Sequence, residues 1–234
     1  MKILINGPSV SLGPMAWPVQ LSVRPDIKQD IEIVNFSRIG CGNNYIQQST
    51  IAELSQRKYD LVIISWTYFF RRDFRSRAPT ASLHGLELED PHLLNNPYLD
   101  KFWFFEKTPE YIHLLASSYG FNLGNYLEAG RFYNMLYTNE YRLEETLLNI
   151  ISLQSVLKSL NIPYLFTFYK PLLHLKKFQH LHNLIDYNNV HRIHLFHLAK
   201  QHHQIINNHP DLPAYNDYLN TILEHPNIKN LIVS

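Results

Sequence analysis

The sequence has a single cysteine, Cys41, among its 234 residues, so an internal disulfide is impossible and a secreted, disulfide-stabilised scaffold is not expected. It has no stretch of about 18 apolar residues, which argues against a membrane-spanning helix. The apolar run before Asn6 has only three residues, too few for a signal peptide. We therefore expect a soluble, cytoplasmic protein.

The sequence also lacks a strong charge of either sign. It has 21 Lys and Arg against 20 Asp and Glu, a formal net charge of +1. Tyr and Phe are plentiful, but no basic stripe runs between them, so we expect no nucleic-acid partner and no anionic membrane partner. Hydrophobic residues make up 45% and charged residues 18%, which suits a sizeable core.

Short apolar runs and helical patterns alternate along the chain. Four runs rich in β-branched and aromatic residues predict buried strands, over residues 2–6, 31–36, 60–66 and 162–169. Apolar residues at spacings of three and four predict helices between and after them, over residues 44–57, 140–160 and 215–223. Together these predict one domain over residues 1–234, a three-layer α/β fold with a doubly wound parallel sheet.

A segment over about residues 69–137 does not fit this alternation. It begins with a polar stretch and then holds twelve aromatic residues between Tyr98 and Tyr137. We expect an aromatic-rich helical insertion above the carboxyl edge of the sheet, where open α/β sheets bind ligands. Two interpretations remain open: the rings form the core of a small helical lid, or some of them line a substrate groove.

Polar and glycine-containing loops follow the first two predicted strands. Ser9 comes directly after the first strand and Gly7, which is where a nucleophile would be exposed, although a serine there is more commonly a turn or cap residue. Gly40 lies in the loop after the second strand, and Asn43 and Asn44 follow it. Backbone N–H groups in such a loop can bind an anion, so the loop is a candidate oxyanion hole.

Two further loops carry candidate residues. After the third strand, Thr67 offers a hydroxyl donor, and Arg71 can either bind a carboxylate or hold the insertion through an ion pair. Late in the chain, His209 precedes the last helix and can reach the sheet edge as a general base. Asn207 lies two residues before it and Asp211 two residues after it.

The order of these four blocks resembles the SGNH/GDSL hydrolase family, including SGNH-like proteins of phage and bacterial genomes. The resemblance covers residues 2–223 apart from the insertion. It is strongest over residues 7–17, 40–46, 60–71 and 209–219. It implies an α/β fold of SGNH type and a serine esterase that needs no cofactor.

The resemblance also implies roles for individual residues. Ser9 would be the nucleophile, His209 its base, and the N–H groups of Ser9 and Gly40 part of the oxyanion hole. The sequence departs from the family pattern at three places: Pro8 stands for the Asp of Gly-Asp-Ser, Thr67 stands near the family's third-block Asn, and Asn207 stands where the triad acid belongs. An Asn can orient an imidazole but stabilises the imidazolium less than an Asp does, so activity would need either a Ser–His dyad or an acid supplied from elsewhere, such as the nearby Asp211.

A histidine-rich stretch raises the question of a metal site. His191, His194 and His197 are spaced by three residues, but on a helix the first and third do not share a face, and no Cys or carboxylate lies nearby. We expect a polar, His-rich surface helix and no metal.

Two hypotheses for the function follow. The first is an SGNH-type serine esterase acting on a small ester, such as an O-acylated carbohydrate. The second is a catalytically degenerate SGNH fold that binds a glycan or protein partner. The oligomeric state stays open.

Overall fold

A computed structural model describes residues 1–11, 16–28, 30–38, 41–69, 71–75, 104–108, 111–115, 138–202, 205–206 and 209–233. The side chains of Ser9, His202 and His209 lie outside this description, as do those of residues 71–75, 104–108, 111–115 and 205–206. No helix within the described residues combines the length and apolar character that crossing a bilayer requires.

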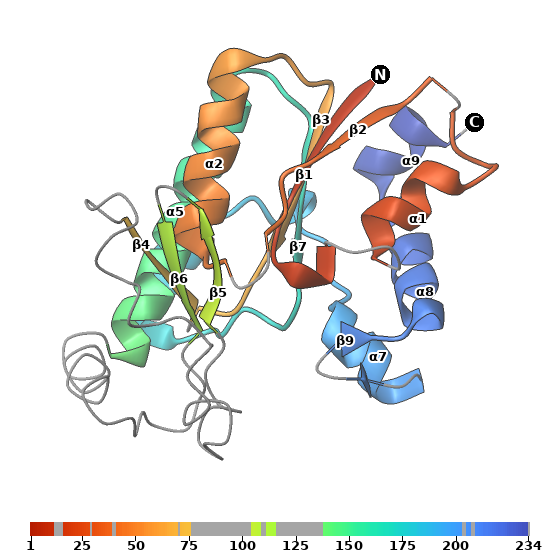
Figure 1. The fold of residues 1–234 in the computed structure, drawn as a ribbon. Coiled ribbons are helices and arrows are strands. Elements are labelled where there is room, and N and C mark those ends of the chain that lie inside the picture. Colours follow the sequence, from red (N-terminus) through yellow and green to blue (C-terminus); the bar gives the residue numbers. More distant parts are fainter. Residues whose placement is uncertain are drawn as a thin grey trace.

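Four parallel strands form the central sheet, in the order β2-β1-β3-β7 (Figure 1). They are β1 (Lys2–Asn6), β2 (Glu32–Asn35), β3 (Leu61–Trp66) and β7 (Tyr164–Phe168). All four lie within the predicted runs. The largely apolar sequences of β1, β3 and β7 match strands that are covered on both faces, and β3 is buried along its whole length. Strand β2 lies at the edge of the sheet, and its Glu32 and Asn35 are exposed.

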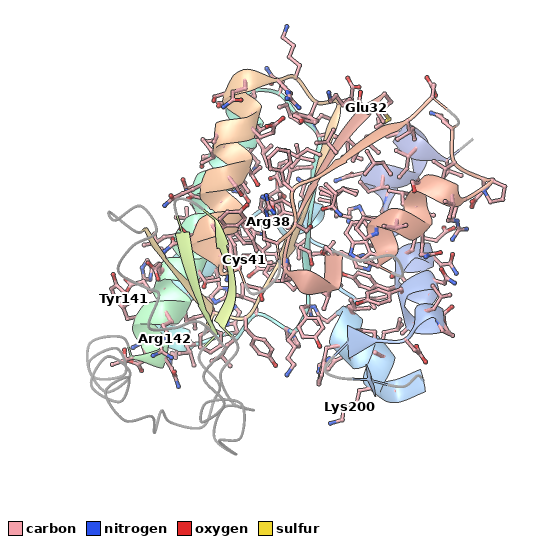
Figure 2. The ribbon with its side chains drawn as sticks, viewed as in Figure 1. Glu32, Arg38, Cys41, Tyr141, Arg142 and Lys200 are labelled. Carbon is pink, nitrogen blue, oxygen red and sulfur yellow. The ribbon has the colours of Figure 1, made fainter. Side chains whose placement is uncertain are left out.

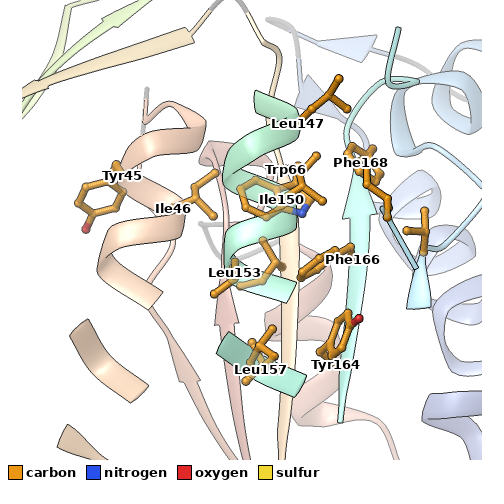
Figure 3. Close-up of a cluster of buried hydrophobic side chains, with 14 of the residues drawn as sticks. Tyr45, Ile46, Trp66, Leu147, Ile150, Leu153, Leu157, Tyr164, Phe166 and Phe168 are labelled. Atoms are coloured by element: carbon orange, nitrogen blue, oxygen red, sulfur yellow. The ribbon is translucent and has the colours of Figure 1, made fainter. Parts of the chain in front are cut away.

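Two long helices cover one face of the sheet. They are α2 (Asn43–Gln56) and α5 (Asn139–Ser159). Alternate residues of the strands, such as Leu4, Val62 and Ile64, point into this layer, which Figure 3 shows in close-up. Leu147, Ile150, Leu153 and Leu157 of α5 are fully buried against it. The apolar spacing predicted in the sequence is therefore the face of α5 that packs on the sheet.

Shorter helices cover the other face. They are α1 (Trp17–Val23), α7 (Leu195–His202), α8 (Leu212–Leu223) and α9 (Pro226–Ile232). The intervening strand residues Ile3, Ile5 and Ile63 pack against this layer, together with Trp17 of α1. Because alternate residues of each strand enter different layers, the fold is the three-layer, doubly wound α/β arrangement that the sequence predicts.

The turn between α5 and β7 is set by a local backbone motif at the end of the helix. Asn161 has a φ of 54°, in the left-handed region. Its N–H donates to the carbonyl of Lys158, and the N–H of Ile162 donates to the carbonyl of Leu157. This pair of bonds is a Schellman motif, which ends the helix and turns the chain into β7.

The described residues of the insertion form a second sheet that the sequence did not predict. Strands β4 (Arg71–Arg75), β5 (Phe104–Thr108) and β6 (Tyr111–Leu115) pair antiparallel in the order β4-β6-β5. The expected helical part of residues 69–137 falls on residues outside those described. An antiparallel pair such as β5-β6 needs only a short connection. The run of aromatic residues hid the alternation of apolar and polar residues that predicts such strands.

The short remaining elements lie toward the end of the chain and after β1. They are the 3₁₀ turns η1 (Ser9–Ser11), η4 (Lys176–Phe178) and η5 (Tyr187–Asn189), the one-turn helix α6 (Gln179–His182), and the small ribbon of β8 (Ile205–Ile206) and β9 (His209–Pro210).

Candidate active site

The turn after β1 depends on a close approach that only glycine permits. A Cβ on Gly7 would lie 2.8 Å from the Cβ of Ser65 and 2.9 Å from its carbonyl oxygen. The chain then forms η1, in which the N–H of Ser11 donates to the carbonyl of Pro8 (2.9 Å). Gly7 thus lets the end of β1 lie directly against β3, and it sets the backbone of Ser9 at the carboxyl edge of the sheet.

Asn6 anchors this turn, a role that sequence reasoning missed. Its side chain is fully buried, and its Oδ1 accepts from the N–H of Gly7 (2.9 Å). Its Nδ2 lies 2.8 Å from Ser49 Oγ and 3.0 Å from Thr50 Oγ1, both on α2. A buried amide that joins β1 to α2 fixes the turn more rigidly than the turn's own sequence would. The sequence signal for this role of Asn6 is that a polar residue ends an apolar run just before a glycine.

The loop after β2 lies along the same turn. The N–H of Arg38 donates to the carbonyl of Gly7 (3.0 Å), and Cys41 Sγ is 3.3 Å from that oxygen. Figure 2 shows Arg38 and Cys41 close together beside α2. The predicted neighbourhood of the first two loops is thus present in the backbone. Gly40 itself lies outside the described residues.

The side chain of Asn43 has a structural role. Its side chain is 2% exposed, its Oδ1 accepts from the N–H of Thr67 (3.0 Å), and its Nδ2 donates to the carbonyl of Thr67 (3.2 Å). The same Nδ2 donates to Thr146 Oγ1 on α5 (3.1 Å). Both amide hydrogens are therefore in use, so Asn43 positions the loop after β3 and leaves no hydrogen for an oxyanion.

Asn44 also links helices. Its Nδ2 donates to Glu145 Oε1 (3.1 Å), and its Oδ1 accepts from Asn149 Nδ2 (2.9 Å). Both partners belong to α5, so the side chain of Asn44 holds the start of α2 against that helix.

Three buried hydroxyls follow three neighbouring strands at this edge. Ser11 comes after β1, Ser37 after β2 and Thr67 after β3, and each is at most 6% exposed. Among the described residues, none of their oxygens has a hydrogen-bond partner. A buried hydroxyl without a partner costs about 1–3 kcal/mol, so a set of them at one edge is unusual in a purely structural region. Thr67, the predicted donor, is one of them.

The late block is carried by the small ribbon and the start of α8. His209 lies in β9, where it pairs with Ile206. Asp211 caps α8, its Oδ1 accepting from the N–H of Ala214 (3.0 Å). Figure 1 shows β9 at the end of the sheet where the strands point, which is the end where β1 gives way to η1. Asn207 lies outside the described residues, as do the side chains of Ser9, Arg71 and His209.

The histidine-rich stretch is not the surface helix that the sequence suggested. His191 precedes α7, is 4% exposed, and its Nε2 lies 2.9 Å from Thr221 Oγ1. Thr221 uses its own hydrogen to donate to the carbonyl of Tyr218 (2.7 Å), so the neutral His191 ring donates from Nε2. Burial, reinforced by His225 and His194, lowers the pKa of His191 to about 4. The three-residue spacing of the histidines suggested one helix, but α7 begins only at Leu195, after the first two histidines.

A second imidazole lies near the end of β7. The ring of His194 is 6.4 Å from that of Phe168, and burial lowers its pKa. Within the described residues, no three histidine, cysteine, aspartate or glutamate side chains gather as metal ligands do.

Of the comparisons with known proteins, only the one with solved structures found a match, and it supports the fold. No family model and no curated protein matches the sequence. Among solved structures, the chain is similar to the psychrotrophic esterase EstA from Pseudoalteromonas sp., in a structure inhibited by monoethylphosphonate. The TM-score is 0.50 and the identity 14%, over 96% of this chain and 95% of that one.

Two further solved structures are similar at lower TM-scores. An acetylxylan esterase, Axe2 from Geobacillus stearothermophilus, gives a TM-score of 0.49 at 13% identity, over 96% of this chain and 93% of that one. A member of the lipolytic G-D-S-L family from Veillonella parvula gives 0.46 at 11%, over 96% and 97%. At a TM-score of 0.50, the similarity to EstA shows that the chain shares the α/β fold of that esterase, and this fold agrees with what the resemblance of the sequence implied.

Proposed function

We propose that this protein is a serine esterase of SGNH type that hydrolyses small esters, O-acylated carbohydrates among them. One observation carries the proposal. In a sheet with the esterase fold, the Gly7 turn presents the backbone of Ser9 at the carboxyl edge, and β9 brings the backbone of His209 to the same end. Ligands of open α/β sheets bind at this edge.

The reaction assigned to this edge has two steps. Ser9 Oγ attacks the ester carbonyl while His209 takes its proton, and the alcohol then leaves with that proton as the acyl-enzyme forms. Water next gives a proton to His209 and attacks the acyl group. The carboxylic acid departs, and the serine hydroxyl is restored.

The negative oxygen of each tetrahedral intermediate needs donors. We assign the backbone N–H groups of Ser9 and Gly40 to this role, with the hydroxyl of Thr67 as the third donor. Support for Thr67 comes from its Oγ1, which is buried and has no hydrogen-bond partner among the described residues, and from the two bonds by which Asn43 holds the Thr67 backbone. Asn207 orients the imidazole, and Arg71 binds a polar part of the substrate.

A second function is favoured by one specific observation. The amide of Asn43 is fully used within the scaffold, and an Asn stands at 207 in place of the triad acid. A fold whose Asn43 amide is not free and which has an Asn at the position of the triad acid suits binding without turnover, so a glycan- or protein-binding module is the alternative.

A fluorophosphonate probe separates the two functions. We expect covalent labelling of the wild-type protein, no labelling of Ser9→Ala, and unchanged labelling of Ser55→Ala, a control on the exposed face of α2. Hydrolysis of 4-nitrophenyl acetate should follow the same order. A wild-type protein that is neither labelled nor active between pH 6 and 9 would favour the binding module.

A further inference from the structure

A lysine is held between two aromatic rings beside the candidate site. Lys170 comes two residues after the end of β7. Its Nζ lies 4.2 Å from the ring centroid of Tyr68 and 3.9 Å from that of Phe196. Tyr68 follows β3, the neighbour of β7, and Phe196 lies in the first turn of α7. Both distances are well within the range of cation–π attraction.

Backbone hydrogen bonds fix these rings in place. The N–H of Tyr169 donates to the carbonyl of Trp66 (3.1 Å), and the N–H of Phe196 donates to the carbonyl of Tyr169 (3.0 Å). The ring of Tyr169 meets those of Tyr68 and Phe196 edge to face, at 6.1 and 5.6 Å. The ammonium group of Lys170 is thus positioned in advance by the ends of two strands and the start of a helix.

No described carboxylate pairs with this lysine. Within the described part of the chain, neither Lys170 nor Lys200, on α7, forms an ion pair. Burial lowers the pKa of Lys170, and the nearby positive charge of Lys200 lowers it further. Asp211, the acid beside β9, is engaged in capping α8. Among the residues that the structure describes, the two ammonium groups therefore have no carboxylate partner.

The position suits recognition of a substrate at Ser9. In the sheet order, β7 is the second strand from β1, and strands lie about 4.8 Å apart, so the two strand ends are about 10 Å apart. Helix α7 also contacts β9, which carries His209. Figure 2 shows Lys200 at the end of the molecule toward which the strands point.

We propose that Lys170, held between Tyr68 and Phe196, and Lys200 form a basic subsite that binds a carboxylate of the substrate. The inference rests on the proposed function and narrows it: the preferred esters carry a negative charge a few bonds from the scissile carbonyl. The ammonium group of Lys170, held in place by the two rings, binds such a charge through a short, charge-assisted hydrogen bond, and the exposed Lys200 adds a second positive charge nearby.

The test compares two esters of matched length. In mono-4-nitrophenyl adipate a carboxylate replaces the terminal methyl group of 4-nitrophenyl hexanoate. We expect wild-type kcat/KM to favour the adipate, and the ratio of the two values to fall about tenfold in Lys170→Met and in Lys200→Met. Lys170→Arg should keep most of the preference. Lys58→Met, on the exposed loop before β3 at the opposite edge, should leave both values unchanged.

A binding measurement separates this inference from the esterase itself. In a Ser9→Ala background, calorimetry should show monomethyl adipate binding more tightly than the neutral dimethyl adipate, and Lys170→Met should remove the difference. If neither nitrophenyl ester is cleaved but this difference is found, the subsite stands and the esterase falls. If the charged and neutral esters bind alike, or the adipate preference survives both Lys→Met changes, the lysines only pack against the rings and the inference is overturned.

Discussion

The side-chain amide of Asn43 makes two hydrogen bonds to the backbone of one residue, Thr67, accepting from its N–H at 3.0 Å and donating to its carbonyl at 3.2 Å. The start of α2 and the end of β3 are thereby fixed to each other at the edge where we place the chemistry. Asn43 acts on that chemistry through Thr67.

We expect Asn43→Ala to lower the free energy of unfolding by about 3 kcal/mol, because two backbone groups of Thr67 lose their partner in a buried place. Urea denaturation followed by circular dichroism measures the change. Asn44→Ala removes bonds that are partly open to solvent and should cost about 1 kcal/mol. Equal losses from the two variants would contradict this role of Asn43.

Replacing Thr67 by Val should separate activity from stability. The hydroxyl of Thr67 has no partner among the described residues, so its loss should leave the free energy of unfolding unchanged or slightly higher. If the hydroxyl binds the oxyanion, kcat should fall about a hundredfold. Thr67→Ser keeps the hydroxyl and should retain most of the activity. An unchanged kcat in Thr67→Val would remove Thr67 from the oxyanion hole.

Gly7→Ala tests the close approach of β1 to β3. The new Cβ would meet the backbone oxygen of Ser65 at 2.9 Å, which cannot move without shifting β3. We expect a loss of about 2 kcal/mol in the free energy of unfolding and a large drop in kcat, because Ser9 moves with the turn. Ser11→Ala, which removes only a buried hydroxyl without a described partner, should raise the free energy of unfolding by about 1 kcal/mol. A fully stable Gly7→Ala protein would show that the turn can shift freely.

Stability should depend on pH through His191. Burial lowers its pKa from 6.5 to about 4, so between these values the unfolded chain binds a proton that the folded protein does not. The stabilisation of the fold by the neutral, buried His191 is complete above pH 6.5. It is lost as the pH falls toward 4, which lowers the free energy of unfolding by up to about 3 kcal/mol.

Denaturation curves at several pH values measure this slope. It should be shallower in His191→Asn, whereas His180→Asn, a change at an exposed residue, should leave it unchanged. An unaltered slope in His191→Asn would assign the dependence to other groups.

The central sheet was predictable from the sequence because three of its strands, β1, β3 and β7, are largely buried. Runs such as those ending at Asn6 and Trp66 are mostly apolar, and this pattern, with helices between, leaves few alternatives to a parallel sheet. The apolar spacing of α5 placed it correctly, because one face of a long helix repeats its signal over several turns.

The second sheet and the details of the site were not predictable. β4, β5 and β6 pair antiparallel across a stretch whose dense aromatics obscure a period of two. The role of Asn6 depends on partners 40 or more positions away, and the role of Asn43 depends on a partner 24 positions away. No local pattern in the sequence shows such contacts. Lys170 is similar, since Tyr68 and Phe196 approach it only once β3, β7 and α7 are assembled.

The pairing of β3 with β7 joins segments far apart in the chain, since Val62 lies opposite Tyr164. This contact closes a loop of roughly a hundred residues, yet doubling such a loop adds only about 0.6 kcal/mol to the entropy of closure. The intervening chain can therefore gain or lose length during evolution at little thermodynamic cost. Folding speed is another matter, because a newly made chain cannot complete its sheet until the strand at residue 164 has left the ribosome.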